Sequence, residues 1–419
     1  MKPSMHVVIV ADHGHINGGQ AKVAIESALG LARKGHRVTF FVAVAPIDPR
    51  LAEAGIEVIC LDQVDIAGAG GLAGQMNFLV QTMWNRAALE RLSGLLAGCD
   101  PADTVVHVHA WAKALSPSIG RALLAARLAC VYTMHEFFLV CPNGGFYDYK
   151  LAEPCKRAPL SGACISVNCD ARTYPRKLMR VARQLILDKL SGFKEAVRHI
   201  VLISDLQMEV SAPWMPQGVT FHKVANPIDA LDEGPKAAPG KDFLYVGRLS
   251  TEKGVAHFCE GARRAGVTPV IAGDGPLGDE LRARYPEAKF LGWQSPQQAR
   301  ALMRSCRALV FPSVWYEGQP LTVYEALAAG APVIVSDVCA GREAVEDGVN
   351  GLWFKSADPD SLASALRRFE SEDEAVRMTA NAHAGYWADP LTLDRHVRAI
   401  EGVYQAALAD RPAASPKAF

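Results

Sequence analysis

Apolar residues along this chain form short continuous runs, and longer segments with helical periodicity separate them. Short apolar runs bounded by turn residues predict buried strands, and the longer periodic segments predict helices. The predicted strands are 5–11, 36–42, 57–61, 104–109, 129–134 and 199–204, then 243–246, 269–272, 308–311, 332–336 and a turn with an edge strand at 348–354. Strands that alternate with helices are typical of parallel α/β sheets.

The strands form two series, which predict two Rossmann-like domains. The chain has 419 residues, 50% of them hydrophobic, and this is enough to bury two cores. The polar stretch 231–241 lies between the two series, so we expect the interdomain linker there. We assign residues 1–228 to a first domain, 229–390 to a second, and 391–419 to a last helix and a disordered tail.

Charge is balanced over the whole chain but not between its halves. Lys and Arg outnumber Asp and Glu by 23 to 18 in residues 1–225, and the counts are 21 and 26 beyond. This distribution argues against nucleic acid as a partner. Residues 172–199, predicted as helix, hold eight cations and two acidic residues. A solvated basic face is one explanation, and peripheral contact with anionic lipid headgroups or a lipid-linked acceptor is the other.

The hydropathy pattern predicts a protein without membrane spans. No apolar stretch approaches the ~18 residues that a spanning helix needs. The opening residues contain a short strand-like run, Val7 to Ala11, and no pattern of a signal peptide. We therefore expect a cytoplasmic protein, with contact at the inner face of the membrane as the alternative already raised for residues 172–199.

Four of the ten cysteines lie in residues 141–170, a segment without helical or alternating pattern. A structural zinc is one hypothesis, but no C-x-x-C pair is present to fix two ligands, and reduced thiols are favoured. Long patternless segments in compact domains are usually functional. We predict an acceptor-side insertion that includes Asn143. The cysteines are Cys141, Cys155, Cys164 and Cys169.

Residues 308–336 predict one βαβ unit that carries two glutamates. Glu317 follows the first strand, and Glu325 lies on the helix that begins near Pro320. Ligands of open α/β sheets bind at the carboxyl ends of the strands, and a helix N-terminus favours an anion such as a diphosphate. The two carboxylates are suited to accept hydroxyls of a sugar and a ribose. The alternative is an ordinary βαβ unit with two solvated glutamates.

Cations and histidines also follow predicted strands. Arg248 and Lys253, in one strand-to-helix loop, can converge on one diphosphate, although two solvated cations are the alternative. His107 and His109 share a face of one strand, but no acidic or cysteine ligand is adjacent to complete a metal site. We therefore favour a cleft-lining His109. His135 follows the strand 129–134, where a hydrogen-bonded loop residue is the simple alternative.

These motifs resemble those of GT4-family retaining glycosyltransferases, which use nucleotide sugars. The matching elements are Glu317-Gly318-x-Pro320, Glu325-Ala326, Gly330-x-Pro332 and Gly247-Arg248-Leu249 with Lys253-Gly254. The resemblance is specific between 245 and 354, moderate in the first βαβ unit and low between 140 and 202. It implies a GT-B fold, in which two Rossmann-like domains face each other across a deep cleft and a C-terminal helix, here 392–408, crosses back to the first domain.

The resemblance also implies the site residues. It assigns catalysis to His135, Glu317, Arg248 and Lys253. It assigns donor binding to Gly18, Gly19, Gly273, Gly292, Trp293, Gly318, Gln319, Pro320, Leu321 and Glu325. The family more often has aspartate after the histidine, so the role of Glu136 is open.

The implied activity is transfer of a glycosyl unit from a nucleotide diphosphate sugar to a hydroxyl acceptor, with retention of the anomeric configuration. The acceptor would be a glycan, a lipid-linked saccharide or a small molecule. The cations at the diphosphate make a metal or other cofactor unnecessary. A nucleotide-sugar epimerase or hydrolase of the same fold is one alternative, and a non-catalytic sugar-nucleotide-binding module is another.

Overall fold

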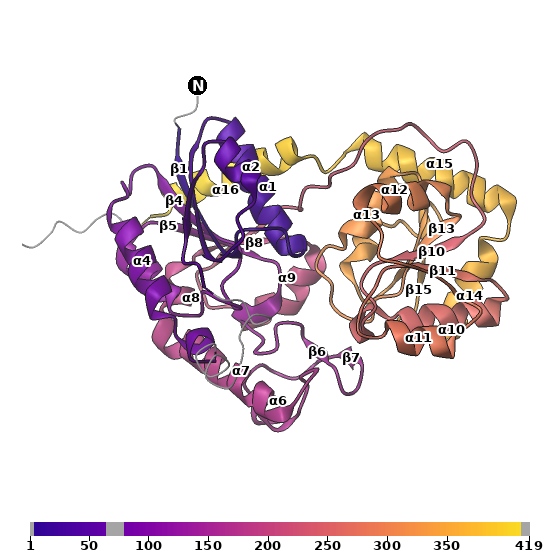
Figure 1. The fold of residues 1–419 in the computed structure, drawn as a ribbon, viewed down its shortest axis with the longest axis horizontal. Helices are drawn as coiled ribbons and strands as arrows, with labels where there is room; N and C mark the ends of the chain where they lie inside the picture. The colour runs from indigo at the N-terminus through magenta and orange to yellow at the C-terminus, as the bar shows by residue number, and fades with distance from the viewer. Residues whose placement is uncertain (1–3, 64–78, 412–419) are drawn as a thin grey trace, which may run out of the picture.

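Two parallel sheets organise the chain in the computed structural model, which describes residues 4–63 and 79–411 (Figure 1). The seven-stranded sheet of the first domain has the order β3-β2-β1-β4-β5-β8-β9. The six-stranded sheet of the second has the order β12-β11-β10-β13-β14-β15. The α/β fold class with two Rossmann-like domains is therefore confirmed, and the predicted boundary at 228 falls between β9 and β10.

The strands match the apolar runs of the sequence. The first sheet contains β1 (His6–His13), β2 (Arg37–Val44), β3 (Glu57–Cys60), β4 (Thr104–Val108), β5 (Ala129–Met134), β8 (His199–Leu202) and β9 (Thr220–Lys223). The second contains β10 (Phe243–Val246), β11 (Pro269–Ala272), β12 (Lys289–Gly292), β13 (Ala308–Phe311), β14 (Val333–Ser336) and β15 (Gly351–Phe354). Of these, β9 and β12 were not among the predicted strands.

Helices cover both faces of each sheet. The first domain has α1 (Gly19–Arg33), α2 (Pro49–Glu53), α4 (Arg86–Ala97), α5 (Ile119–Ala126), α6 (Gly162–Ser166), α7 (Tyr174–Ile186), α8 (Phe193–Ala196) and α9 (Asp205–Ser211). The second has α10 (Val255–Ala265), α11 (Gly278–Arg284), α12 (Pro296–Ser305), α13 (Leu321–Ala328), α14 (Pro359–Arg368) and α15 (Glu372–Ala388). Because both faces are covered, successive residues of β1 enter opposite cores, Val8 and Val10 on one side and Val7 and Ile9 on the other.

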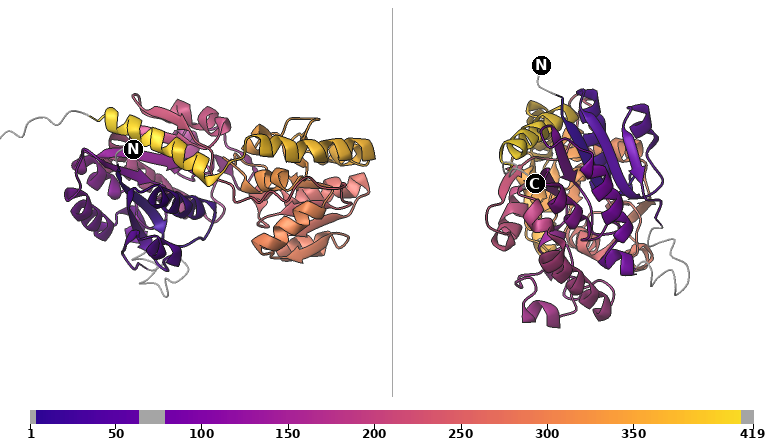
Figure 2. Two further views of the ribbon diagram at one scale, coloured as in Figure 1. Left: turned by 90° about the horizontal axis from the view of Figure 1, so that it is seen from above. Right: turned by 90° about the vertical axis from the view of Figure 1, so that its left-hand side faces the viewer.

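The last helix, α16 (Leu393–Ala409), leaves the second domain and packs on the first (Figure 2). Its buried residues Val397, Ile400 and Tyr404 belong to the core formed by α1 and one face of the first sheet. His396 Nε2 lies 3.0 Å from Ser27 Oγ of α1, which adds a polar contact to this apolar face. The predicted crossover helix at 392–408 is confirmed.

Two predicted helices of the first domain are interrupted. The periodic pattern predicts one helix over 76–96, but the helical residues 79–83 end before a break at 84–85. A new helix, α4, begins at Arg86, where the Asn85 side chain accepts a hydrogen bond from Ala88 N and caps it. The glycine-rich stretch 67–74, which the sequence predicts as a surface loop, lies outside the described residues. The predicted helix at 172–199 divides into α7, a π-turn at Leu187–Ser191 and α8, with Gly192 at φ 71° between the last two.

Polar contacts join the two domains beside the linker. The Gln319 side chain accepts from Asn226 N at 2.6 Å and donates to Asn226 O at 3.2 Å. Glu343 of the second domain accepts hydrogen bonds from the backbone amides of Asp205 and Leu206, at 3.0 and 2.8 Å. Those amides are the first of α9, so a carboxylate from one domain caps a helix of the other.

Replacing Glu343 by alanine is expected to loosen this contact. The substitution removes two charge-assisted hydrogen bonds, each worth roughly 1.5–3 kcal/mol, from the domain interface. Small-angle scattering should then show a larger radius of gyration than for the native chain. Glu346→Ala, which removes an exposed carboxylate without an ion pair in the described structure, is the matched control. Identical scattering from the Glu343 variant and the native chain would contradict a role in holding the domains.

Candidate active site

A cavity of about 250 Å³ lies where loops of the two domains meet. The first domain contributes Gly18 and Gly19 after β1 and His135 after β5, and the second contributes the loop from Trp315 to Gln319 after β13. All of these loops follow the carboxyl ends of parallel strands, which is the edge where open α/β sheets bind ligands. The structure thus brings together Gly18, Gly19, His135, Glu317, Gly318, Gln319 and Leu321 of the predicted site.

Glu317 and Lys253 form an ion pair at this cavity. Lys253 Nζ lies 2.7 Å from Glu317 Oε1, and both side chains are about four-fifths buried, with exposed fractions of 20% and 18%. The other carboxylate oxygen of Glu317 accepts hydrogen bonds from Trp315 Nε1 at 3.2 Å and Ser313 Oγ at 3.3 Å. The carboxylate is therefore fixed by three donors, which preorganises it for a ligand.

A close backbone approach explains why Lys253 reaches Glu317. Gly254 follows it at φ 67°, and a Cβ atom built there would lie 2.0 Å from the carbonyl oxygen of Pro312. Only glycine fits this contact between the loop after β10 and the loop after β13. Val314 N also donates to Glu252 O at 3.0 Å, so the two loops are joined by their backbones.

Arg248, Gly273 and Trp293 line a second hollow, of about 320 Å³, in the second domain. Gly273 has φ 150°, and a Cβ atom there would lie 1.8 Å from Gly247 O. The turn at Gly273 therefore packs against the turn at Gly247 through their backbones. The Arg248 guanidinium is exposed and makes no hydrogen bond or ion pair within the described residues. Gly292 does not line this hollow, and its carbonyl accepts from Gly273 N at 2.8 Å.

Glu325 lies in a third hollow, with Lys22, Asp229 and Arg300. Burial raises its pKa above the ordinary value, Asp229 adds to the shift, and Lys22 and Arg300 oppose it. The sequence predicts that Glu317 and Glu325 lie in neighbouring parts of one site. In the structure the two glutamates line different hollows. Pro320, the residue before α13, lines none of these three hollows.

His135 lies half-buried in the wall of the cavity between the domains. Its Nε2 is 3.1 Å from Nδ1 of His109, so one of the two rings donates this hydrogen bond to the other. Burial, with a contribution from His396, lowers the pKa of His135 to about 3. The imidazole is neutral near pH 7, and its Nδ1 makes no hydrogen bond within the described part of the chain, so this nitrogen is available to a ligand.

Sequence patterns place His109 on the cleft surface, and this expectation is wrong. The residue is fully buried beneath His135, and its Nε2 has no hydrogen-bond partner among the described residues. Its ring lies 4.1 Å from that of His107, centroid to centroid. His107 in turn lies 2.7 Å from the Tyr404 hydroxyl of α16. The crossover helix, which covers this face of the sheet, is the reason that His109 is buried.

These buried histidines predict acid-dependent loss of stability. Burial holds the pKa values of His107, His109, His135 and His396 below 6.5, so below that pH the unfolded chain binds more protons than the folded one. Stability therefore falls as the pH drops from 6.5, by up to about 1.4 kcal/mol per pH unit for each group.

Replacing His396 by glutamine should weaken this dependence on pH. The pKa of His396 is lowered to about 4, so its contribution to the loss of stability falls between pH 6.5 and 4. Urea-unfolding midpoints at pH 7.5 and pH 5 give the measurement. The difference between the two midpoints should be smaller in His396→Gln than in the native chain. His15→Gln, in the loop after β1, is the control and should leave the difference unchanged. An equal pH dependence in all three proteins would contradict the prediction.

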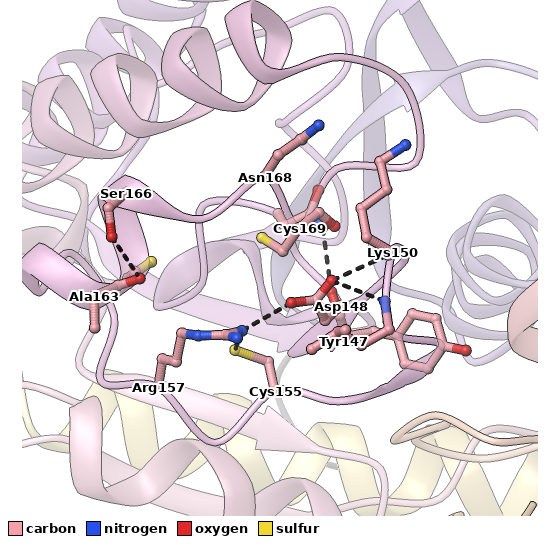
Figure 3. Close-up of polar contacts among 12 residues, drawn as sticks. Tyr147, Asp148, Lys150, Cys155, Arg157, Ala163, Ser166, Asn168 and Cys169 are labelled. Carbon is pink, nitrogen blue, oxygen red and sulfur yellow. Dashed lines mark hydrogen bonds and ion pairs between the residues drawn. The ribbon is translucent and has the colours of Figure 1, made fainter.

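The segment 141–170 is an ordered insertion around a buried carboxylate, Asp148 (Figure 3). Asp148 accepts from Lys150 N at 3.0 Å and pairs with Arg157 Nη1 at 2.9 Å. The antiparallel pair β6 (Tyr147–Asp148) and β7 (Glu153–Pro154) and the helix α6 complete it. The sequence shows no regular pattern because these elements are too short to produce one.

Asn143 is a structural residue of this insertion and does not face an acceptor. Its side chain is buried, donates to Cys169 O at 2.9 Å and accepts from Arg180 Nη1 at 2.5 Å. Lys177 Nζ lies 3.0 Å from Cys169 Sγ and 3.5 Å from Cys164 Sγ. Residues 4–63 and 79–411 contain no group of three or more histidine, cysteine or acidic side chains arranged for a metal. Zinc at the four cysteines remains a hypothesis.

Asp148→Ala is expected to open the insertion. It leaves Arg157 and two backbone amides without their acceptor and should cost the local structure about 2 kcal/mol or more. Limited proteolysis within 141–170 should be at least about tenfold faster, because cleavage follows the population of the open form. Glu153→Ala, an exposed carboxylate of the same hairpin, is the control. Equal cleavage rates in the two variants would contradict the role of Asp148.

Two family models match the chain, one in each domain. A glycosyl transferase 4-like domain matches residues 18–183, and a glycosyl transferases group 1 domain matches residues 240–372. An uncharacterised glycosyltransferase of Methanocaldococcus jannaschii is 26% identical over 375 residues, which cover 85% of this chain and 86% of the relative. The chain is a GT4-like glycosyltransferase.

Other relatives match parts of this glycosyltransferase. UDP-Gal:α-D-GlcNAc-diphosphoundecaprenol α-1,3-galactosyltransferase of Escherichia coli is 30% identical over 40% of the chain and 47% of the relative. Glycogen synthase of Mycobacterium tuberculosis is 34% identical over 45% and 49%. Among solved structures, Anabaena HepE in complex with UDP and glucose has a TM-score of 0.65 at 16% identity, covering 96% of this chain and all of that one. This last likeness supports the GT-B fold.

Several residues of the cavity in the glycosyltransferase were not predicted. Lys113 lines it from the loop after β4, where the Asp12 carboxylate accepts from the amides of Lys113, Ala114 and Leu115 at 2.9 to 3.0 Å. Trp315 also lines it. Asp12 directly follows the apolar run 5–11 of the sequence, and this position is the signal that could have indicated a functional loop. Lys113 has no comparable signal.

Proposed function

We propose that the glycosyltransferase moves a glycosyl unit from a nucleotide diphosphate sugar to a hydroxyl acceptor and retains the anomeric configuration. The observation that carries this proposal is the cavity between the domains, where the Gly18-Gly19 loop and His135 face the fixed Glu317–Lys253 pair. A carboxylate beside a lysine is suited to a sugar joined to a diphosphate. The carboxylate accepts hydrogen bonds from the sugar hydroxyls, and the lysine neutralises charge on the phosphate. The nucleotide-sugar relative in Escherichia coli supports such a donor.

In the proposed reaction, the bond between the anomeric carbon and the diphosphate oxygen breaks, and its electron pair leaves with the diphosphate. The acceptor oxygen forms the new bond on the same face of the sugar. The acceptor's proton passes to the departing phosphate oxygen. Two charges therefore develop together, positive on the sugar ring and negative on the diphosphate.

The residues of the cavity are placed to stabilise these charges. Lys253 is held at the cavity, and Arg248 is an unpaired guanidinium in the second hollow, so a diphosphate bound at the loop that carries both residues would meet two cations. Glu317 would accept sugar hydroxyls and stabilise the developing positive charge. His135, neutral near pH 7, would bind a sugar hydroxyl or the leaving phosphate through Nδ1. Glu325 would hold the ribose.

We also propose that transfer needs no divalent metal, since Lys253 and Arg248 supply the positive charge at the leaving group. Rates measured after exhaustive treatment with EDTA and after readdition of Mg²⁺ test this point. Equal rates support the proposal. Activity that is lost with EDTA and restored by Mg²⁺ would contradict it.

A panel of nucleotide sugars, incubated with and without membrane extract, tests the proposed function. Consumption of one nucleotide sugar that depends on the extract, with release of the nucleoside diphosphate, supports transfer. Free sugar without an acceptor would favour a hydrolase, and an altered nucleotide sugar would favour an epimerase. Binding without turnover under every condition would favour a non-catalytic module.

A further inference from the structure

A basic pocket of about 340 Å³ lies beside the active-site cavity in the first domain. Its charged lining consists of five cations, Lys113, Arg172, Arg176, Arg180 and Arg183, and it includes no carboxylate. The remaining lining is mainly apolar and includes Met83, Phe138 and Met179. A pocket with this composition is suited to an anion that also carries an apolar or sugar portion.

The arginines come from one face of α7 and the residues before it. They recur at intervals of four, four and three along the chain, which is the spacing of neighbours on one side of a helix. The buried side of α7, with Lys177, Val181 and Gln184, faces the domain instead. The arginines of residues 172–183 are therefore concentrated on the pocket, and the one lysine of α7, Lys177, points instead to the cysteines of the insertion.

Most of these cations lack a partner of opposite charge. Arg180 pairs with the buried Asp170 at 3.0 Å, but Lys113, Arg172, Arg176 and Arg183 form no ion pair within the described residues. Arg183 is held by the carbonyl oxygen of Ala112 at 2.5 Å, and its guanidinium lies 5.0 Å from the centre of the Phe138 ring. Like charges gathered without counter-charges are costly for the folded chain, and a bound anion removes that cost.

Lys113 connects this pocket to the active site. This residue lines both the basic pocket and the cavity that holds His135 and Glu317. The Asp12 carboxylate fixes the backbone of this loop, so Lys113 stands at a defined place between the two spaces. A ligand whose anionic group occupies the pocket can therefore extend a hydroxyl into the reaction cavity.

We propose that this pocket binds a phosphoryl group of the acceptor. Arg172, Arg176 and Lys113 contact the phosphate oxygens, and Arg183 contributes from the pocket wall. This inference rests on the proposed function, because it assigns the acceptor of the same reaction. The phosphoryl group belongs to a lipid-linked saccharide or to a soluble sugar phosphate. The exposed leucines of the same region, Leu178, Leu185 and Leu190, with exposed fractions of 41%, 44% and 52%, favour the lipid-linked form.

Binding of two phosphoryl probes by the full chain tests the proposal. Farnesyl diphosphate represents the lipid-linked source, glucose 1-phosphate represents the soluble source, and farnesol is the uncharged control, all measured by calorimetric titration. The doubly substituted variant Arg172→Gln, Arg176→Gln should bind the preferred phosphoryl probe at least about tenfold more weakly, as expected for the loss of charge-assisted hydrogen bonds. Tight binding of farnesyl diphosphate alone identifies the lipid source, and tight binding of glucose 1-phosphate identifies the soluble one.

The control variant Lys189→Gln, Arg198→Gln removes the same charge from exposed positions of the same basic segment, outside the pocket. It should bind the probes within about twofold of the native chain, because a distant solvated charge is screened. Equal weakening in both variants, or no binding of either phosphoryl probe, would overturn the proposal. Nucleoside diphosphate binding should remain unchanged in both variants. The two proposals can fail separately. If no nucleotide sugar acts as a donor but the Arg172→Gln, Arg176→Gln variant still binds the phosphoryl probe more weakly than the native chain, the proposed function is wrong and the phosphoryl pocket is supported.

Discussion

Glu317→Gln is expected to lower kcat by ~100-fold or more, because it removes the charge that faces the developing positive charge of the sugar. Glutamine keeps the shape of the side chain and can still accept from Trp315 Nε1 and Ser313 Oγ, which hold the carboxylate now. The loss should therefore appear in the chemical step and not in folding. Steady-state kinetics with the active nucleotide sugar give kcat, and a thermal melt monitors the fold.

Glu346→Gln is the matched control for this variant, since it makes the same chemical change at an exposed position. It should leave kcat unchanged. A rate for Glu317→Gln within about threefold of the native rate would show that the Glu317 charge does not act in the transition state.

Lys253→Ala is expected to have a similarly large effect, again ~100-fold or more on kcat, because negative charge on the departing diphosphate loses its cation. The substitution also leaves Glu317 without its partner at 2.7 Å. Because the pair is about four-fifths buried, the variant should also lose some stability, and kcat is measured at a temperature where a thermal melt shows the variant folded. Arg248→Ala should act in the same direction, and its effect should not add fully to that of Lys253→Ala, since both stabilise one leaving group.

Lys241→Ala, an exposed cation of the same domain, is the control for these two variants. It should retain native kinetics. Native kcat in Lys253→Ala and Arg248→Ala would exclude leaving-group stabilisation by these cations. A change in KM alone would mean that they bind donor and transition state equally.

Much of the fold and part of the site could be predicted from the sequence. The apolar runs mark most of the strands, because strands buried on both faces leave little room for polar residues. His135 directly follows such a run and Glu317 lies in the loop after another, and the edge of a parallel sheet places both at the cleft. The Glu317–Lys253 pair required the structure, since it depends on the backbone contact of Gly254 with Pro312.

The errors have a common physical origin in packing between distant segments. His109 also follows a strand, but α16 covers that face of the sheet, with Tyr404 held against the neighbouring His107. Asn143 lies in a segment without pattern, and only the folded insertion shows that its amide joins Cys169 to Arg180. A residue that follows a strand can be predicted to lie at the edge of the sheet, but this position does not predict how deeply its side chain is buried.

The described residues contain no helix long and apolar enough to cross a membrane. The basic pocket offers a different route to a lipid-linked substrate, in which arginines of α7 hold the phosphoryl group while the saccharide enters the cavity beside Lys113. The predicted membrane contact of residues 172–199 thereby becomes a specific hypothesis about the acceptor.

Proton NMR of the anomeric signals during turnover tests the central claim most directly. With an α-linked nucleotide sugar and its acceptor, the donor signal should be replaced by a product signal with the same small coupling, and Glu317→Gln should abolish this change on the same timescale. A product with the large coupling of a β-linkage would contradict retention. Free sugar formed at the same rate without an acceptor would contradict glycosyl transfer itself.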